Sequence, residues 1–121
     1  MSLKMRTREV DEVIIIDVSG QITLGEASAA IRDEVRDQSG HGNRKILLNL
    51  ADVNYIDSAG LGELTAAYSS VKNKGGELKL LSLTKRVHDL MQITKLYTVF
   101  DVHDDEKKAI ASFGSQAAAK A

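Results

Sequence analysis

Hydrophobic and polar residues in the first part of the chain follow the pattern of two paired strands. Residues 5–10 are mostly charged and form a weak first strand, whereas residues 13–18 are β-branched and almost continuously apolar. A continuous apolar run is expected of a strand that is covered on both faces. Asp11 and Glu12 are placed in a tight turn, so the charged first strand pairs antiparallel with the second and forms an edge of the sheet.

The segment after the second strand predicts a helix. Its apolar residues recur at helical spacing: Ala27, Ile31 and Val35. Thr23 and Glu26 have the spacing of a capping box, in which the Thr23 hydroxyl accepts a hydrogen bond from the backbone N–H of Glu26. We therefore expect Thr23 to cap this helix and Gly40 to end it.

A second strand–helix unit follows. The short apolar run 45–50 predicts the third strand, and residues 54–62 form the turn after it. Apolar residues then recur at helical spacing: Leu61, Leu64, Tyr68 and Val71. Gly75-Gly76 ends this pattern. Ser58 is therefore expected at, or within one residue of, the start of this helix.

The remaining chain predicts two more strand–helix units. Residues 77–83 and 99–102 read as the fourth and fifth strands. Thr84 caps the helix after the former, and the acidic residues 104–106 favour the start of the last helix. The inward-facing residues are Val87, Leu90 and Met91 in one helix and Ala109, Ile110 and Phe113 in the other. The small-residue segment 114–121 is expected to be a flexible tail.

Strands and helices alternate after the first strand pair, which predicts an α/β fold in one small domain, residues 1–121, with an ordered core at about 5–113. The sheet of about five strands is mixed and mostly parallel, its first edge strand is antiparallel, and about four helices cover it. Partners of such folds bind beyond the carboxyl ends of the strands. Segments 20–24 and 54–62 both follow strand ends, so we expect them to share one rim and predict this rim as the working surface.

Ser58 has unusual neighbours for a serine at the start of a helix. Such a serine commonly serves only as a cap, but Asp57 directly before it can do that job. Ala59, Gly60 and Gly62 keep the surroundings small, although glycine in a helix costs about 1 kcal/mol relative to alanine. Free backbone N–H groups and the positive end of the helix dipole favour a phosphate here. We therefore interpret Ser58 as a functional hydroxyl.

The composition is that of an ordinary globular protein and excludes several classes of function. The chain has 121 residues, of which 43% are hydrophobic and 27% are charged, and its formal net charge is -1. This charge offers no basic field for nucleic acid, and no apolar run approaches the ~18 residues of a membrane span. The chain has no cysteine, which excludes disulfides and thiolate metal ligands. We expect a cytoplasmic protein.

An enzymatic role for Ser58 finds no support in the sequence. A nucleophilic serine needs a neighbouring base, and the G-x-S-x-G motif is missing. The histidines lie in separate segments without triad or metal spacing: His41, His88 and His103. Gly60 and Gly62 do not complete a nucleotide fingerprint, because Thr65 stands at the third glycine position. We therefore predict no enzyme, no cofactor and no metal site.

The residues around Ser58 resemble a family motif. Residues 55–62, with the sequence YIDSAGLG, are similar to the D-S-x-G-L-G phosphorylation turn of STAS domains in the anti-sigma factor antagonist family. Residues 18–22 and 76–80 support the resemblance, which covers about 5–113. It implies a STAS-like fold and a regulatory protein that binds other proteins.

The resemblance also implies a partner-switching mechanism. In the family, the serine that matches Ser58 is phosphorylated by an ATP-using anti-sigma factor kinase, and Asp57 matches the acid beside it. The unphosphorylated form binds that anti-sigma factor and releases a sigma factor, and a phosphatase resets the cycle. The alternative is a STAS docking subunit of a transporter or signalling scaffold, in which Ser58 stays unmodified.

The implied partner-binding surface lies on the predicted rim. Its residues are Gly20, Gln21, Thr23, Leu24, Asp57, Ser58, Ala59, Gly60, Leu61 and Gly62. Thr23 departs from the family pattern, since kinase-regulated members often carry an aspartate in this loop. The expected partners are an anti-sigma factor kinase and a phosphatase, without nucleic acid or direct membrane insertion, and the sequence leaves the oligomeric state open.

Overall fold

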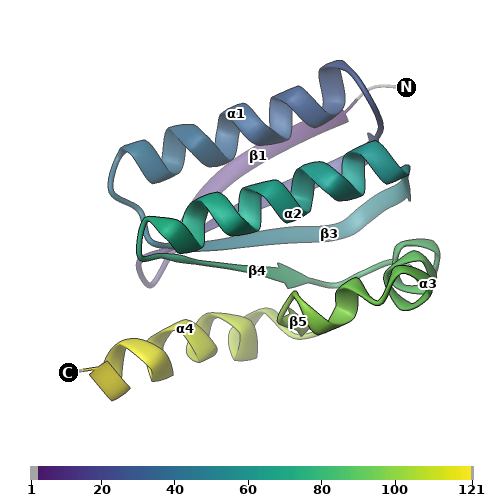
Figure 1. The fold of residues 1–121 in the computed structure, drawn as a ribbon. Helices are drawn as coiled ribbons and strands as arrows, with labels where there is room; N and C mark the ends of the chain where they lie inside the picture. The colour runs from purple at the N-terminus through teal and green to yellow at the C-terminus, as the bar shows by residue number, and fades with distance from the viewer. Residues whose placement is uncertain (1–2, 121) are drawn as a thin grey trace.

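The structure of the chain is a computed structural model that describes the backbone of residues 3–120 and the side chains of residues 3–113. In this part of the chain the elements follow in the order β1 (Leu3–Val10), β2 (Val13–Ile22), α1 (Glu26–Gly40), β3 (Lys45–Ile56), α2 (Ser58–Asn73), β4 (Glu77–Leu81), α3 (Lys85–Thr94), a 3-10 helix (Leu96–Thr98), β5 (Val102–His103) and α4 (Glu106–Lys120) (Figure 1). The side chains of the predicted tail, 114–121, lie outside the described residues.

The strands form one mixed sheet in the order β1-β2-β3-β4-β5. The charged strand β1 is antiparallel to β2 at the edge, and the other neighbouring strands are parallel. Figure 1 shows α1 and α2 side by side across one face of the sheet, with α4 on the other side. The predicted α/β architecture is confirmed, because each parallel connection passes through a helix.

Strand β2 is apolar on both faces because each face has its own core. Ile14 and Ile16 contribute to the larger core, which includes residues of α1, α2 and α3. Val13 and Ile15 point to the opposite face and belong to a smaller core that includes Ala109 and Phe113 of α4 (with Leu47 and Leu81 of the sheet). Successive side chains of a strand alternate between faces, so the continuous apolar run of β2 is explained.

Two strands extend further than the sequence pattern indicates. Strand β2 continues to Ile22 instead of ending near residue 18, and β3 continues to Ile56 instead of ending near residue 50. The two extensions pair with each other, for example Gln21 with Tyr55, after irregularities in register. The polar residues of these segments hid the extensions, because backbone pairing continues where the apolar run stops.

The predicted capping box at the start of α1 is wrong. Helix α1 begins at Glu26 after Gly25, and no side chain caps it. Thr23 instead uses its backbone carbonyl, which accepts a hydrogen bond from the N–H of Ser28 (3.2 Å). Gly25 has a φ of 107°, a conformation that glycine tolerates and other residues rarely adopt, so the chain turns into the helix two residues beyond Thr23.

The later strands are shorter than predicted. Strand β4 ends at Leu81, since Ser82 has a φ of 58° and leaves the extended conformation. Strand β5 is limited to Val102–His103, because the preceding residues 96–98 form a 3-10 helix. The predicted Thr84 cap is confirmed, with its hydroxyl oxygen accepting from the N–H of Val87 (3.4 Å).

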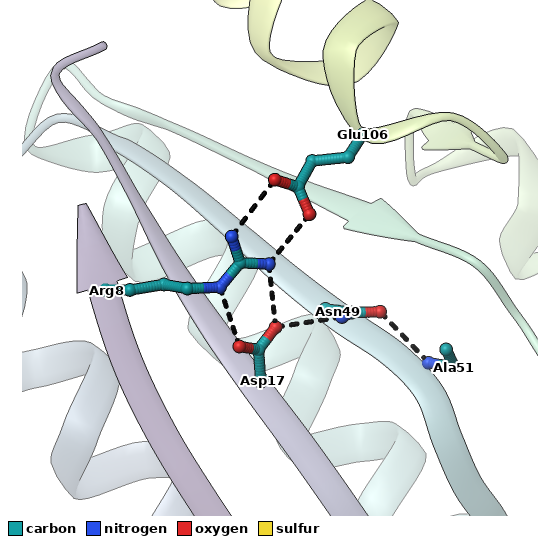
Figure 2. Close-up of polar contacts among 5 residues, drawn as sticks. All are labelled: Arg8, Asp17, Asn49, Ala51 and Glu106. Atoms are coloured by element: carbon teal, nitrogen blue, oxygen red, sulfur yellow. Dashed lines mark hydrogen bonds and ion pairs between the residues drawn. The ribbon is translucent and has the colours of Figure 1, made fainter. Parts of the chain in front are cut away.

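Two cations of the sheet hold helix α4 in place. The guanidinium of Arg8 on β1 lies between two carboxylates, with Nε 2.7 Å from Asp17 Oδ2 and Nη2 2.7 Å from Glu106 Oε1 (Figure 2). These hydrogen bonds from Arg8 lower the pKa of both carboxyl groups. On β4, the buried Lys79 donates from Nζ to Ser112 Oγ at 2.7 Å. Helix α4 is thus fixed to the sheet at its first turn and again near Ser112.

Candidate functional site

The carboxyl ends of β2 and β3 meet at one rim, as the sequence predicted. Ile22 at the end of β2 is paired with Ile56 at the end of β3. Ser58 is the first residue of α2, directly beyond this pair, and its side chain is exposed. Asp57 caps the helix, so the Ser58 hydroxyl is not engaged as the cap. The structure therefore presents the Ser58 hydroxyl to solvent, on the same rim as the segment that leaves β2.

Asp57 joins the two segments of the rim. Its Oδ1 accepts a hydrogen bond from the N–H of Gly60 (2.7 Å) in α2. Its Oδ2 accepts one from the N–H of Leu24 (3.0 Å) in the loop after β2. These hydrogen bonds, first the one from Gly60 and then the one from Leu24, lower the pKa of the Asp57 carboxyl. The carboxylate is held by backbone donors and orients the loop, and its lowered pKa makes it a weaker base.

The two glycines of α2 have different environments. A Cβ at Gly60 would collide with the carbonyl oxygen of Ile22 and come within 2.9 Å of its carbonyl carbon. Gly60 therefore allows the start of α2 to lie against the end of β2. Gly62 is exposed, and a Cβ there would meet nothing within 4 Å. No packing contact explains a glycine at position 62.

The predicted partner-binding residues differ in what they offer to a partner. The exposed members are Leu24, Ser58 and Gly62, and the half-buried members are Gly20, Gln21, Thr23, Asp57 and Ala59. Gly60 and Leu61 are buried, and Leu61 belongs to the larger core. Leu24 is 78% exposed, although its backbone is fixed by Asp57. The accessible surface thus consists of the loop after β2 and the outer side of the first turn of α2.

Beside Ser58 lies an open groove that the sequence did not predict. It has a volume of about 440 Å³, and its walls come from the turn between β3 and α2 and from α3. The lining residues are Tyr55, Ile56, Asp57, Ser58, Arg86, Asp89, Leu90 and Ile93. Ile93 is 78% exposed, and the Arg86 guanidinium lies 5.8 Å from the centre of the Tyr55 ring. One feature of the sequence could have indicated the groove: Ile93 is apolar but lies off the inward side of its helix, which carries Val87 and Met91.

Two of the three histidines lie beside aspartates away from Ser58. His41 lies beside Asp37 at the end of α1, and His103 Nε2 lies 3.1 Å from Asp101 Oδ2 near β5. Among the residues that the structure describes, no three His, Cys, Asp or Glu side chains are grouped to hold a metal ion. Within the same residues, no helix is long and apolar enough to cross a membrane. The rim therefore offers an exposed hydroxyl beside a backbone that Asp57 holds by hydrogen bonds.

Two bacterial proteins of similar length match nearly the whole chain. The anti-sigma-B factor antagonist of Bacillus subtilis (strain 168) is 29% identical over 102 residues, which are 84% of this chain and 92% of that protein. The anti-sigma F factor antagonist of Paenibacillus polymyxa is 29% identical over an alignment 115 positions long, which covers 91% of this chain and 94% of that protein. Both relatives are therefore similar to this chain along almost their entire length.

A solved protein has the same fold in two chemical forms. The phosphorylated form of the Bacillus cell fate determinant SpoIIAA matches with a TM-score of 0.70 at 20% identity, covering 90% of this chain and 98% of that chain. The unphosphorylated form of the anti-sigma factor antagonist SpoIIAA matches with a TM-score of 0.68 at 19% identity, covering 90% of this chain and 96% of that chain. The STAS domain family model matches residues 4–109. The chain therefore belongs to the STAS domain family.

Proposed function

We propose that this chain is an anti-sigma factor antagonist that works by partner switching. The unphosphorylated chain binds an anti-sigma factor that is also a kinase. When this kinase phosphorylates Ser58, the chain dissociates from the anti-sigma factor, and it binds again after a phosphatase has removed the phosphate. The observation that carries the proposal is the exposed Ser58 at the first residue of α2, beside a helix cap that Asp57 provides. The names of the relatives support an anti-sigma factor as the partner.

The position of Ser58 suits a phosphate that leaves the fold intact. A phosphoserine carries about -1.5 to -2 charges at neutral pH and three acceptor oxygens. At the first residue of a helix, these oxygens meet the positive end of the helix dipole. Since Asp57 keeps its bonds to Gly60 and Leu24, no cap is lost on modification. The fold of SpoIIAA matches this chain in both its phosphorylated and unphosphorylated forms, which supports a switch without rearrangement.

The same phosphate weakens binding at the rim. A docked partner would strip water from the phosphate and leave it beside the ionised Asp57 carboxylate. Mismatched charge at an interface costs several kcal/mol. A cost of about 4 kcal/mol corresponds to a thousandfold loss of affinity. We therefore expect the switch to act locally, through charge and steric bulk at Ser58.

The contact surface of the proposal includes the loop after β2. The Asp57 carboxylate fixes the N–H of Leu24, so the exposed leucine side chain is held out on a rigid backbone. Thr23 contributes its backbone to the loop rather than a charge, so the kinase meets a neutral loop at that position. The chemistry of transfer belongs to the kinase, which supplies ATP, metal and base. This protein only presents its hydroxyl, in the cytoplasm, and performs no catalysis itself.

The proposal is tested by measuring affinity for the anti-sigma factor kinase of the same organism. We expect phosphoserine at position 58 to lower the affinity by about a thousandfold. Ser58→Asp, with a smaller charge, should lower it less, and Ser58→Ala should bind. Ser69→Asp adds the same charge at an exposed position of α2 and is the matched control, with affinity near that of the wild type. Equal affinities for the phosphorylated and unphosphorylated proteins would instead favour a docking subunit without phosphorylation.

A further inference from the structure

Arg86 is a cation without a carboxylate partner at the groove beside Ser58. Among the described residues, no carboxylate lies within ion-pair distance of Arg86, whereas the neighbouring Lys85 Nζ is 3.0 Å from Asp89 Oδ2. The Arg86 guanidinium instead lies over the Tyr55 ring, 5.8 Å from its centre. An exposed cation–π contact of this kind is weak. Arg86 is thus an available positive charge on the α3 wall of the groove.

The position of Arg86 relative to Ser58 is fixed by the backbone. The hydroxyl of Thr84, the cap of α3, donates to the carbonyl oxygen of Val53 at 2.9 Å. This bond attaches the start of α3 to β3 two residues before Tyr55. Arg86 and Ser58 both line the groove, one from α3 and the other from α2. Arg86 therefore lies on the α3 wall of the same groove that Ser58 lines from α2.

We propose, on the basis of the Ser58 phosphorylation set out above, that Arg86 binds the phosphate of phosphoserine 58 and positions it across the groove. A guanidinium donates two parallel hydrogen bonds to a phosphate, in addition to the attraction of opposite charges. This pairing outweighs the contact of Arg86 with the Tyr55 ring. On modification the guanidinium leaves the ring and moves toward the phosphate.

The proposed bridge changes more of the surface than the serine alone. Its two ends lie in different walls of the groove, whose apolar part includes Tyr55, Leu90 and Ile93. A guanidinium and a phosphate that bind each other across the groove place charge next to these apolar side chains. Phosphorylation would therefore remove from a partner both the Ser58 hydroxyl and the groove beside it.

Of the charged groups around the groove, Arg86 is the one that can bind the phosphate. Asp57 is held by the N–H groups of Gly60 and Leu24 and adds negative charge near the phosphate. Asp89 is paired with Lys85 and lies beside His88, whose Nδ1 is 3.5 Å from Asp89 Oδ1. The Lys85 charge is thus already compensated by Asp89, whereas that of Arg86 is not.

The test uses protein in which phosphoserine is incorporated at position 58 during translation, so no kinase is needed. Titration followed by ³¹P NMR gives the pKa at which the phosphate gains its second charge, ordinarily ~6. We expect Arg86→Gln to raise this pKa by about half a pH unit, a threefold change in proton affinity. Arg86→Lys should restore part of the difference. Lys85→Gln, the neighbouring cation, and His88→Asn, which removes the nearby titrating group, should each leave the effect of Arg86 in place.

A phosphate pKa that is the same in wild type and Arg86→Gln would overturn the bridge. So would an equal rise with Lys85→Gln, since the effect would then reflect general positive charge on α3. Either result leaves partner switching untouched, because the phosphate is installed without the kinase. Conversely, the phosphate pKa could rise in Arg86→Gln while the phosphorylated and unphosphorylated proteins bind the anti-sigma factor with equal affinity. That combination would reject the partner switch and keep the bridge. Thermal unfolding of each variant confirms that the comparison is made between folded proteins.

Discussion

Gly60 and Gly62 are two residues apart in the sequence, yet the structure requires only one of them to be glycine. Gly60 lies against the backbone of Ile22, where a Cβ has no room. Gly62 faces open space at a position where alanine would stabilise the helix. A glycine that costs stability without a packing reason is typical of a functional surface. This contrast supports the outer side of the first turn of α2 as a contact surface.

We predict opposite effects of alanine at these two glycines. Gly62→Ala should raise the free energy of unfolding by about 0.5–1 kcal/mol, because alanine favours the helix. Gly60→Ala should lower it by about 1–3 kcal/mol, because the new Cβ forces α2 away from β2. Urea unfolding measures both, and affinity for the anti-sigma factor should fall for Gly62→Ala despite the added stability. Loss of stability in Gly62→Ala would show that an unrecognised contact requires the glycine.

The contribution of the Asp57 carboxylate to stability should depend on pH. Its pKa is lowered in the folded protein by the N–H groups of Gly60 and Leu24. Its bonds therefore stabilise the fold above the ordinary pH range of the carboxyl and lose this effect as the pH falls through the folded-state pKa. Asp57→Ala should unfold at a lower temperature than the wild type at neutral pH, and the difference should vanish in acid. A difference that stays constant between neutral and acidic pH would contradict this role of the carboxylate.

At the scale of elements, the docking of α4 depends on charges that β1 and β4 provide. Arg8 pairs with Glu106 at the first turn of α4, and Lys79 reaches Ser112 further along the helix. Beneath these contacts, Phe113 and Ala109 fill the smaller core. Polar contacts therefore fix the position of a helix whose burial is mainly apolar.

Glu106 allows this docking to be tested by pH. The Arg8 hydrogen bonds lower the Glu106 pKa from its ordinary value of 4.5. The pair therefore stabilises the fold fully at pH values above that ordinary value, and the effect is lost as the pH falls through the folded-state pKa. Glu106→Gln should cost about 1 kcal/mol or less at neutral pH, because the pair is partly exposed. Unfolding by urea at several pH values should show the difference shrinking in acid. Glu9→Gln, an exposed change of the same type on β1, is the control.

The elements also show which parts of the fold the sequence could predict. Hydrophobic periodicity was sufficient to predict the α/β order and the antiparallel edge strand, and residue type was sufficient for the Thr84 cap, because each depends on residues that are close in the sequence. It missed the paired extensions of β2 and β3, which depend on backbone contacts between distant segments. It also placed a capping box at Thr23, where the turn at Gly25 decides the start of α1. Local patterns cannot register these tertiary constraints.

The site was predicted in the same uneven way. The positions of Asp57 as the cap and of Ser58 at the start of α2 could be predicted, because a strand end, a helix cap and small residues follow one another in the sequence. The groove was missed because it forms only when α3 packs beside the turn between β3 and α2. Leu61 was placed both in the apolar pattern of the helix and on the partner surface, and its side chain lies in the core. Functional residues that are neighbours in the sequence can be identified from it, but a groove between distant segments can be identified only from the fold.

At the scale of the whole molecule, the proposed switch needs no change of fold. The rim is built on the ends of β2 and β3, which pair directly, and Asp57 ties the loop after β2 to α2. We therefore expect a phosphate on these hydrogen-bonded segments to alter the charge of the surface and to leave the packing beneath it unchanged. Under this proposal the domain is a scaffold that presents the Ser58 hydroxyl, and the affinity of the partner depends on whether that hydroxyl is phosphorylated.

Mapping of the modified residue tests this account most directly. The protein is incubated with the anti-sigma factor kinase of its own organism and ATP, and mass spectrometry locates the phosphate. We predict a single phosphate on Ser58, absent from Ser58→Ala and retained by Ser69→Ala, the control serine exposed on the same helix. A phosphate on another residue, or undiminished labelling of Ser58→Ala, would contradict the assignment of Ser58 as the switch.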